Sequence, residues 1–340
     1  MTEQWQPGIT QHTLRIRAEL LKTLRNFFAV RDVLEVQTPL LSRSANPDPN
    51  VIPLTAKLHL RGQPTAHYLQ TSPEFAMKRL LAAGSPSIYQ IVTVFRDYDL
   101  SARHLPEFAL LEWYRIDFDH YALMNEVEML LHECLHIVQR DCPAVPRYSY
   151  AQLFQQYAGF NADFDPNNIS AATLREHCVA AGFAIPDSML DANNVLNNRD
   201  VWLDFILSLH ILPQLPKSPL FIYDYPVSQA ALAQIVMASD KVTPVAARFE
   251  LLWGDLELAN GFYELTDAIE QRQRFESDLQ QRAQRGLSAV TLDENFLMAL
   301  QMGLPRCAGV ALGIERLLMV LLDATHIRQV TAFADDFVNE

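Results

Sequence analysis

Glycine and cysteine are both scarce in this chain. It has 11 glycines against 19 prolines, and only four cysteines among 340 residues. The cysteines form no CxxC pair and no other spacing typical of zinc ligands, so the sequence favours buried thiols in a reducing compartment over a structural zinc site. They are Cys134, Cys142, Cys178 and Cys307.

Long apolar runs and repeats are also lacking. No hydrophobic stretch approaches the length that crosses a bilayer. The segment from Met1 to Thr13 is polar and lacks the apolar core of a secretory signal, so we expect a cytoplasmic protein. Without internal repeats, low-complexity tracts or flexible linkers, one catalytic domain with insertions is predicted rather than two tethered domains.

Basic residues are fewer than acidic ones. The chain has 27 Lys and Arg residues and 40 Asp and Glu residues, which give a formal net charge of −13. A broad non-specific grip on nucleic acid needs clustered basic residues, so this composition disfavours that class of protein, although a local basic patch stays open. The hydrophobic fraction of 49% and charged fraction of 20% are those of an ordinary globular enzyme.

Because glycine is scarce, the motifs that contain it are informative. Gly309 and Gly313 lead into an apolar helix that carries Arg316 one turn in. Glycine allows a ligand to approach the backbone, and the helix N-terminus and the guanidinium attract phosphate. The alternative is a core helix with a surface arginine. Two charged clusters on strand-like segments favour the functional interpretation.

The first cluster runs from Arg96 to Arg115. It lies around a predicted hairpin with strands at 88–95 and 107–114, whose charged tip carries Arg96 and Asp97. We expect Arg96, Glu112 and Arg115 to face one side of a sheet. Cross-strand ion pairs on an exposed face are the alternative.

The second cluster runs from Glu257 to Asp267. It follows Gly254-Asp255, a turn signal that predicts a hairpin of strands 248–253 and 256–262. Further helices and strands follow from periodicity, and no chemical motif is evident between 147 and 219, which suggests an insertion. The helices are predicted at 14–30, 75–83, 121–138, 150–157, 171–181, 201–212 and 266–285, and further strands at 33–39 and 220–226.

Taken in order, these stretches resemble the catalytic domain of class II aminoacyl-tRNA synthetases, and most closely the lysyl subtype. The carrying motifs are Thr71-Ser72-Pro73-Glu74, Phe95-Arg96, Glu257 to Phe262 and Gly313 to Arg316. The resemblance implies an α+β fold, with an antiparallel sheet flanked by helices, in a single domain over 1–340 with an insertion around 147–219. Because the first motif begins near Leu14, we expect no anticodon-binding domain and therefore a similarity to the truncated ligases that modify elongation factor P.

That resemblance implies an AMP-forming ligase that activates lysine, with (R)-β-lysine preferred, and transfers it to a lysine side chain of elongation factor P. ATP would be a substrate, Mg²⁺ a cofactor, and the protein a homodimer formed through the first helix and strand, without tRNA anticodon recognition. Two alternatives stay open. One is a free-standing synthetase-like enzyme that uses tRNA or a small amine as acceptor. The other is an inactive paralogue that binds lysine or nucleotide.

The family's residues carry over position by position. Arg96 resembles the arginine on the α-phosphate, and Arg316 the arginine on the γ-phosphate and adenine face. Glu257 and Glu264 resemble the residues that hold Mg²⁺, since hard oxygen ligands suit that ion. Other residues that resemble the ATP site are Asp97, Tyr98, Leu105, Leu258 and Gly313. Those that resemble the amino-acid pocket are Ser72, Pro73, Glu74, Tyr114, Asn260, Glu264 and Ala311.

Three positions depart from or refine the family pattern. Tyr98 stands where the family has a glutamate for the adenine amino group, and Leu105 where it has an asparagine near ATP. Adenine recognition would then need Asp97 or Asp99, or nucleotide affinity would be lower. Ala311 stands where lysyl-tRNA synthetases usually have glycine, and its methyl group would change the pocket in favour of β-lysine.

Overall fold

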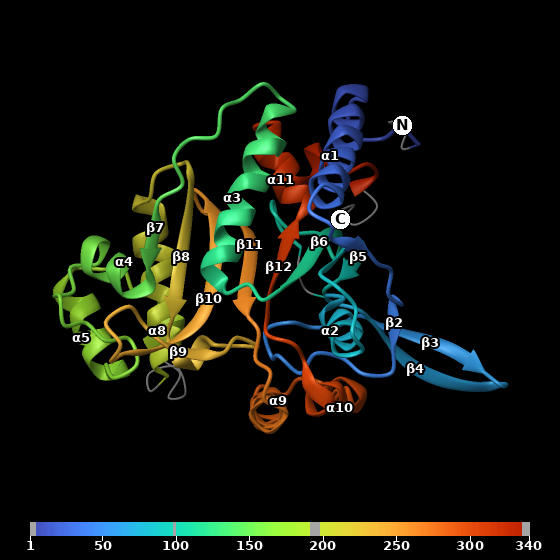
Figure 1. The fold of residues 1–340 in the computed structure, drawn as a ribbon. Helices are drawn as coiled ribbons and strands as arrows, with labels where there is room; N and C mark the ends of the chain where they lie inside the picture. The colour runs from blue at the N-terminus through green and yellow to red at the C-terminus, as the bar shows by residue number, and fades with distance from the viewer. Residues whose placement is uncertain (1–4, 98–99, 191–197, 335–340) are drawn as a thin grey trace. The chain divides into compact units, whose positions relative to one another are not determined.

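A computed structural model describes residues 5–97, 100–190 and 198–334 (Figure 1). The chain divides into two compact units, Met1–Cys142 with Tyr263–Glu340, and Pro143–Phe262. Both units combine helices with mainly antiparallel strands, which confirms the predicted α+β class. Among the helices of the described residues, none is long and apolar enough to span a membrane.

The first unit contains a sheet in the order β1-β5-β6-β12. The predicted hairpin of β5 (Ile88–Phe95) and β6 (Glu107–Ile116) is confirmed, and β12 (Cys307–Gly313) pairs antiparallel with β6. The strand predicted at 33–39 is shorter, because only β1 (Leu34–Glu35) pairs, parallel to β5. Pro39 has no N–H to continue such a ladder.

One face of this sheet is covered by α1 (Gln11–Ala29), which begins earlier than predicted because Thr10 caps it. Phe28 stacks on Tyr89, with ring centroids 4.4 Å apart, and meets Trp113 edge-on at 5.4 Å. All three aromatic side chains are buried. This aromatic cluster joins the first helix to β5 and β6.

Arg115 lies on the same face as Trp113, because residues two apart on a strand share a face. Its Nε atom is 3.2 Å from Glu126 Oε1 on α3 (His120–His136), and Trp113 Nε1 donates to Glu126 Oε2 at 3.0 Å. Glu112 therefore points to the opposite face. The prediction that Glu112 and Arg115 share one face is wrong, since an odd number of steps separates them.

Replacing Phe28 with alanine should lower the free energy of unfolding by about 3–5 kcal/mol, because the side chain is fully buried among large rings. Denaturant titration measures this loss. Val242→Ala, at a position with 76% exposure away from the first helix and strand, is the control and should change the stability by less than about 0.5 kcal/mol. Equal effects at the two positions would contradict the assigned core.

The helices α2 (Glu74–Ala82), α9 (Ala268–Gln284) and α10 (Glu294–Gly303) also belong to the first unit. Phe75 of α2 stacks on Phe296 of α10, with ring centroids 4.6 Å apart. A three-stranded sheet projects as a hairpin (Figure 1). Its strands are β2 (Leu41–Ser42), β3 (Thr55–Leu60) and β4 (Gln63–Leu69), and the unit ends with α11 (Ile314–Leu321) and η4 (Ile327–Gln329).

The second unit is built on β10 (Pro244–Trp253), which pairs antiparallel with β11 (Leu256–Tyr263) and β8 (Pro219–Tyr225). The predicted turn at Gly254 is confirmed, with φ at +60°. The helix predicted at 201–212 is an α-helix that continues as a π-helix. Its remaining elements are β7 (Arg147–Ser149), β9 (Ile235–Met237), α4 (Tyr150–Tyr157), α5 (Ala171–Ala180), α6 (Asp187–Leu190), α8 (Arg199–Phe205), η1 (Ile206–Ile211), η2 (Leu212–Gln214) and η3 (Val227–Gln229).

Candidate active site

The face of the first unit's sheet opposite α1 carries polar side chains from two neighbouring strands. Gly309 of β12 lies opposite Tyr114 of β6, and Ala311 lies opposite Glu112. Directly opposite residues of an antiparallel pair project to the same face. Glu112, Tyr114, Gly309 and Ala311 therefore line one surface. Ala311 also packs against the small apolar cluster of Val92, Val94 and Leu110.

Gly309 allows two side chains to approach the strand closely. A Cβ atom at this position would overlap the Tyr114 ring and Glu264 Oε1. The φ of Gly309 is not positive, so the requirement for glycine comes from space rather than from backbone conformation. Tyr114 and Glu264 thus lie directly over β12.

Glu112 is a buried carboxyl held by two hydroxyl groups. Ser72 Oγ donates to its Oε2 at 2.7 Å, and Tyr114 Oη donates to its Oε1 at 2.7 Å. Burial, and then the charge of Glu74, raise the pKa of Glu112 to about 7, although the two hydrogen bonds oppose this shift. Ser72 Oγ also accepts from the Glu74 N–H at 3.0 Å, at the start of α2.

Glu264 and Glu74 are linked by a buried lysine. Lys78 Nζ lies 2.6 Å from Glu74 Oε1 and 2.5 Å from Glu264 Oε2, and its side chain has no exposed surface. Burial raises the pKa of Glu264 to about 8 against the opposing charge of Lys78. Burial alone would lower the pKa of Lys78, but the charges of Glu264 and Glu74 raise it, so Lys78 stays an ammonium.

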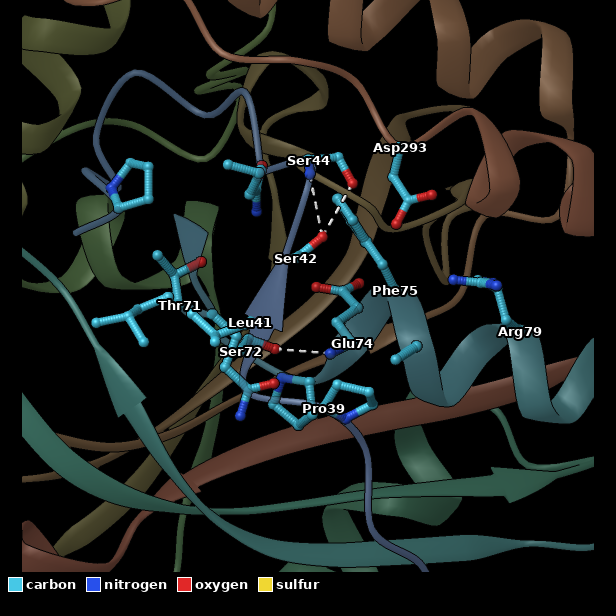
Figure 2. Close-up of a pocket in the computed structure, with 17 residues that line it drawn as sticks. Pro39, Leu41, Ser42, Ser44, Thr71, Ser72, Glu74, Phe75, Arg79 and Asp293 are labelled. Atoms are coloured by element: carbon cyan, nitrogen blue, oxygen red, sulfur yellow. Dashed lines mark hydrogen bonds between the residues drawn. The ribbon is translucent and has the colours of Figure 1, made fainter. Parts of the chain in front are cut away.

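A cavity of about 120 Å³ lies beside this cluster (Figure 2). Figure 2 shows the Glu74 carboxylate among the residues that line it, with Ser42, Phe75 and Asp293 around it. A carboxylate in a small cavity with both polar and apolar walls suits an ammonium group on a carbon chain. Ser72 and Glu74 belong to both the cavity and the cluster, and Pro73 also lines the cavity.

The two predicted phosphate arginines contact the same loop, residues 100–106. The backbone N–H of Arg96 donates to the Pro106 carbonyl at 2.9 Å, and its guanidinium lies over the Phe108 ring. Arg316 Nη2 contacts His104 Nε2. Arg96 Nε also donates to the Thr71 carbonyl at 3.4 Å, next to Ser72. This places Arg96 between the loop and the amino-acid cluster.

The other predicted nucleotide residues have separate surroundings. Gly313 is the last residue of β12, one turn before Arg316, and a Cβ atom at this position would be in ordinary van der Waals contact with the Arg316 side chain. Asp97 is half-buried and donates its backbone N–H to the Ile52 carbonyl at 2.8 Å. Leu105 is buried with 1% exposure and brings no polar group to a nucleotide. Tyr98 and Asp99 lie outside the described residues.

Glu257, Leu258 and Asn260 lie on β11 of the second unit. Asn260 accepts from Arg248 Nε at 3.3 Å and donates to Glu250 Oε1 at 3.2 Å. Burial raises the pKa of Glu250 to about 7, and the charge of Glu257 adds to the rise while Arg248 opposes it. Glu250 and Arg248, which the sequence did not single out, therefore set the orientation of Asn260.

The predicted site residues offer Mg²⁺ only a small number of carboxylate ligands. Among the described residues, no group of three or more His, Cys, Asp or Glu side chains could hold a metal ion. Mg²⁺ often binds one or two carboxylates and takes its other ligands from phosphates and water, so Glu257 is compatible with it. Glu264 is paired with Lys78, which favours the amino-acid role over the metal role.

Three residues of the cluster were not assigned to the site from sequence. Lys78 reads as an ordinary polar residue of a helix, and Glu112 as one side of a cross-strand ion pair. The spacing of Lys78 four residues after Glu74 was a usable signal, because such pairs meet on one helix face. Gly309 was recognised as part of a motif, but its contacts with Tyr114 and Glu264 follow only from the sheet pairing.

Comparison of the sequence with known proteins shows the family to which the chain belongs. The family model of class II tRNA synthetases of the D, K and N type matches residues 6–336. A curated relative, the elongation factor P–(R)-β-lysine ligase of Mannheimia succiniciproducens, is 44% identical over 334 residues, which cover 97% of each chain. The chain belongs to the class II tRNA synthetase family of the D, K and N type.

Proposed function

We propose that this protein activates lysine, with (R)-β-lysine as the preferred isomer, by means of ATP and transfers it to a lysine side chain of elongation factor P. The observation that carries this proposal is the 44% identity over 97% of both chains to a ligase of that name. The cluster of Glu74, Glu112 and Glu264 supports it, because three carboxylates around one lysine suit a substrate with two ammonium groups.

In the first step the substrate carboxylate attacks the α-phosphorus of ATP, and pyrophosphate leaves as the aminoacyl-adenylate forms. Arg96 is proposed to stabilise the charge on the α-phosphate, and Arg316 to bind the γ-phosphate and the adenine face. Asp97, Leu105, Leu258 and Gly313 are proposed to line the nucleotide site. Glu257 would hold Mg²⁺, which supplies charge neutralisation to the phosphates when bound.

In the second step the neutral ε-amine of the acceptor lysine attacks the adenylate carbonyl, and AMP leaves. The amine must lose a proton, and a carboxylate or the adenylate phosphate would accept it. Glu74, Tyr114 and Glu264 are proposed to hold the ammonium groups of the activated substrate during this step. Ser72 and Pro73 set the start of the helix that carries Glu74, and Asn260 is proposed to orient the substrate.

Mass spectrometry of elongation factor P, after incubation with ATP and each lysine isomer, tests the proposal. The expected result is a mass increase of one lysyl group, larger with (R)-β-lysine than with α-lysine. Ala311 is proposed to set this preference, since it faces the same surface as Gly309 and Glu112. Charging of tRNA with no change in elongation factor P would instead favour the free-standing synthetase, and binding without pyrophosphate exchange an inactive paralogue.

Free lysine should bind the pocket beside Glu112 and Glu264 more tightly as pH rises from about 6 to about 8. At pH 6 the carboxyls of Glu112 and Glu264, with pKa values of about 7 and about 8, are largely protonated. An ammonium ligand stabilises the carboxylates, so binding releases protons, and Kd falls by up to about tenfold per pH unit for each proton released. Calorimetry in buffers of different ionisation enthalpy measures both quantities. A Kd for lysine that does not change with pH over this range would contradict the prediction.

We also propose a homodimer formed through the first helix and strand, in the cytoplasm. Apolar side chains are exposed along this part of the chain, with Val30 79% and Leu34 51% exposed. Leu14, Leu40 and Leu41 are exposed to between 37% and 39%. Exposed apolar side chains gathered in one segment are typical of an interface. Sedimentation equilibrium of the full chain measures the oligomeric state.

A further inference from the structure

Lys78 is an unusual residue for the interior of a binding pocket. Lysine is rarely buried unless it is paired with an opposite charge. This side chain has no exposed surface, and its partners are Glu74 at 2.6 Å and Glu264 at 2.5 Å. Its Nζ atom also lies 5.9 Å from the centre of the Phe296 ring. Phe296 in turn stacks on Phe75. The ammonium is thus held from two sides by carboxylates and backed by an aromatic ring.

The carboxyl groups around Lys78 outnumber its single positive charge. The buried Glu112 and Glu264 and the half-buried Glu74 act on one another and on Lys78. Fully ionised, three carboxylates and one ammonium leave two negative charges. Buried charge is unfavourable unless it is paired, so this pocket is complementary to a ligand that brings two positive charges. Lysine and β-lysine each carry two ammonium groups, and their carboxylate is the group that reacts with ATP.

We infer that Lys78 determines specificity by cancelling one of the three carboxylates, so that the pocket matches an amino acid with two ammonium groups. The inference rests on the proposed function of this pocket. Lys78 then acts as a fixed internal cation. It forms no covalent bond with the substrate and stays in the pocket throughout the reaction. Without Lys78, a ligand with two ammonium groups would leave one carboxylate unpaired.

A charge-balanced set of variants tests this inference. Lys78→Met removes the ammonium and keeps an unbranched chain of similar length. Glu112→Gln removes one negative charge and keeps groups that can bond to Ser72 and Tyr114. The double variant restores two net negative charges. Calorimetry without ATP measures Kd for lysine, (R)-β-lysine and norleucine, which lacks the terminal ammonium.

Each single change should weaken the binding of the preferred lysine isomer by about 10- to 100-fold, because one buried charge is left unpaired. The double variant should bind it within about tenfold of wild type, since a pair that interacts is not additive. Wild type should bind norleucine at least about 100-fold more weakly than lysine. Lysine-dependent pyrophosphate exchange should follow the same order across the four proteins.

Two results would overturn the inference. If the losses of the single variants multiply in the double variant, Lys78 only supports the fold. If Lys78→Met binds lysine more tightly than wild type, Lys78 competes with the substrate for Glu74 and Glu264. Should the methionine variant not fold, Lys78→Gln with the same change at Glu112 makes the same comparison. A wild type that neither binds lysine nor exchanges pyrophosphate refutes the proposed function instead, which separates the two failures.

Discussion

Replacing Arg96 with alanine is expected to reduce lysine-dependent ATP–pyrophosphate exchange by at least about 10³-fold, because it removes charge that stabilises the reacting phosphate. The position of Arg96 supports this result. Its guanidinium lies over Phe108 and within hydrogen-bond distance of the Thr71 carbonyl, directly before Ser72 and the carboxylate cluster. This position is compatible with the proposed contact between Arg96 and the α-phosphate.

The effect should be confined to catalysis. Arg96→Ala should still bind lysine in the absence of ATP within about threefold of wild type, because Lys78, Ser72 and Tyr114 hold the carboxyl groups of the cluster. Arg285→Ala is the matched control, since that residue is bonded to Asn50 on an exposed surface. Exchange at the wild-type rate in Arg96→Ala would end the assignment of this arginine to the α-phosphate.

Gly309→Ala should produce the second large loss, about 10²-fold or more in kcat/KM for lysine. The added methyl group would overlap the Tyr114 ring and Glu264 Oε1, so both side chains must move away from the strand. Such overpacking costs typically about 1–3 kcal/mol, and a misplacement of about 1 Å in a binding group can cost 10²-fold in rate. Steady-state exchange at varied lysine concentration measures the change, with thermal melting to follow stability.

Gly313→Ala separates this steric effect from a general intolerance of the motif. A Cβ atom at Gly313 would have only Arg316 carbons near it, at 3.7 to 3.8 Å, which is ordinary van der Waals contact. Lysine binding without ATP should therefore survive in Gly313→Ala and be lost in Gly309→Ala. Equal loss of lysine binding in both variants would show that the space above Gly309 has no special role.

Much of the fold follows from local sequence signals. The β-rich runs at 88–95 and 107–114, joined by a polar loop, predicted the β5–β6 hairpin, and Gly254-Asp255 predicted the β10–β11 turn. The helix 75–83 was predicted within one residue at each end. These elements were predictable because periodicity, capping and turn formation depend on residues close together in the chain. The errors fell on β1, where pairing depends on a distant strand, and on the faces of Glu112 and Arg115.

The candidate site was predictable in part. Ser72, Glu74, Tyr114 and Glu264 were assigned through the family resemblance, and the structure brings all four together in the first unit. Lys78 was missed because lysines on helices are usually solvated, and its spacing from Glu74 does not show that its side chain is buried. The roles of Glu257 and Asn260 remain predictions. The assignment of residues to the metal ion and to the nucleotide also remains a prediction.

The amino-acid sequence by itself determined the family of this protein, most of its helices and strands, and the acidic and basic residues available for chemistry. Tertiary structure decided which of those charges are buried together. A helix, two strands and the segment after a third strand bring Lys78 and three carboxyls into one cluster. Charge is the same wherever it stands in a sequence, but its energy depends on how much water remains around it, and only folding removes that water.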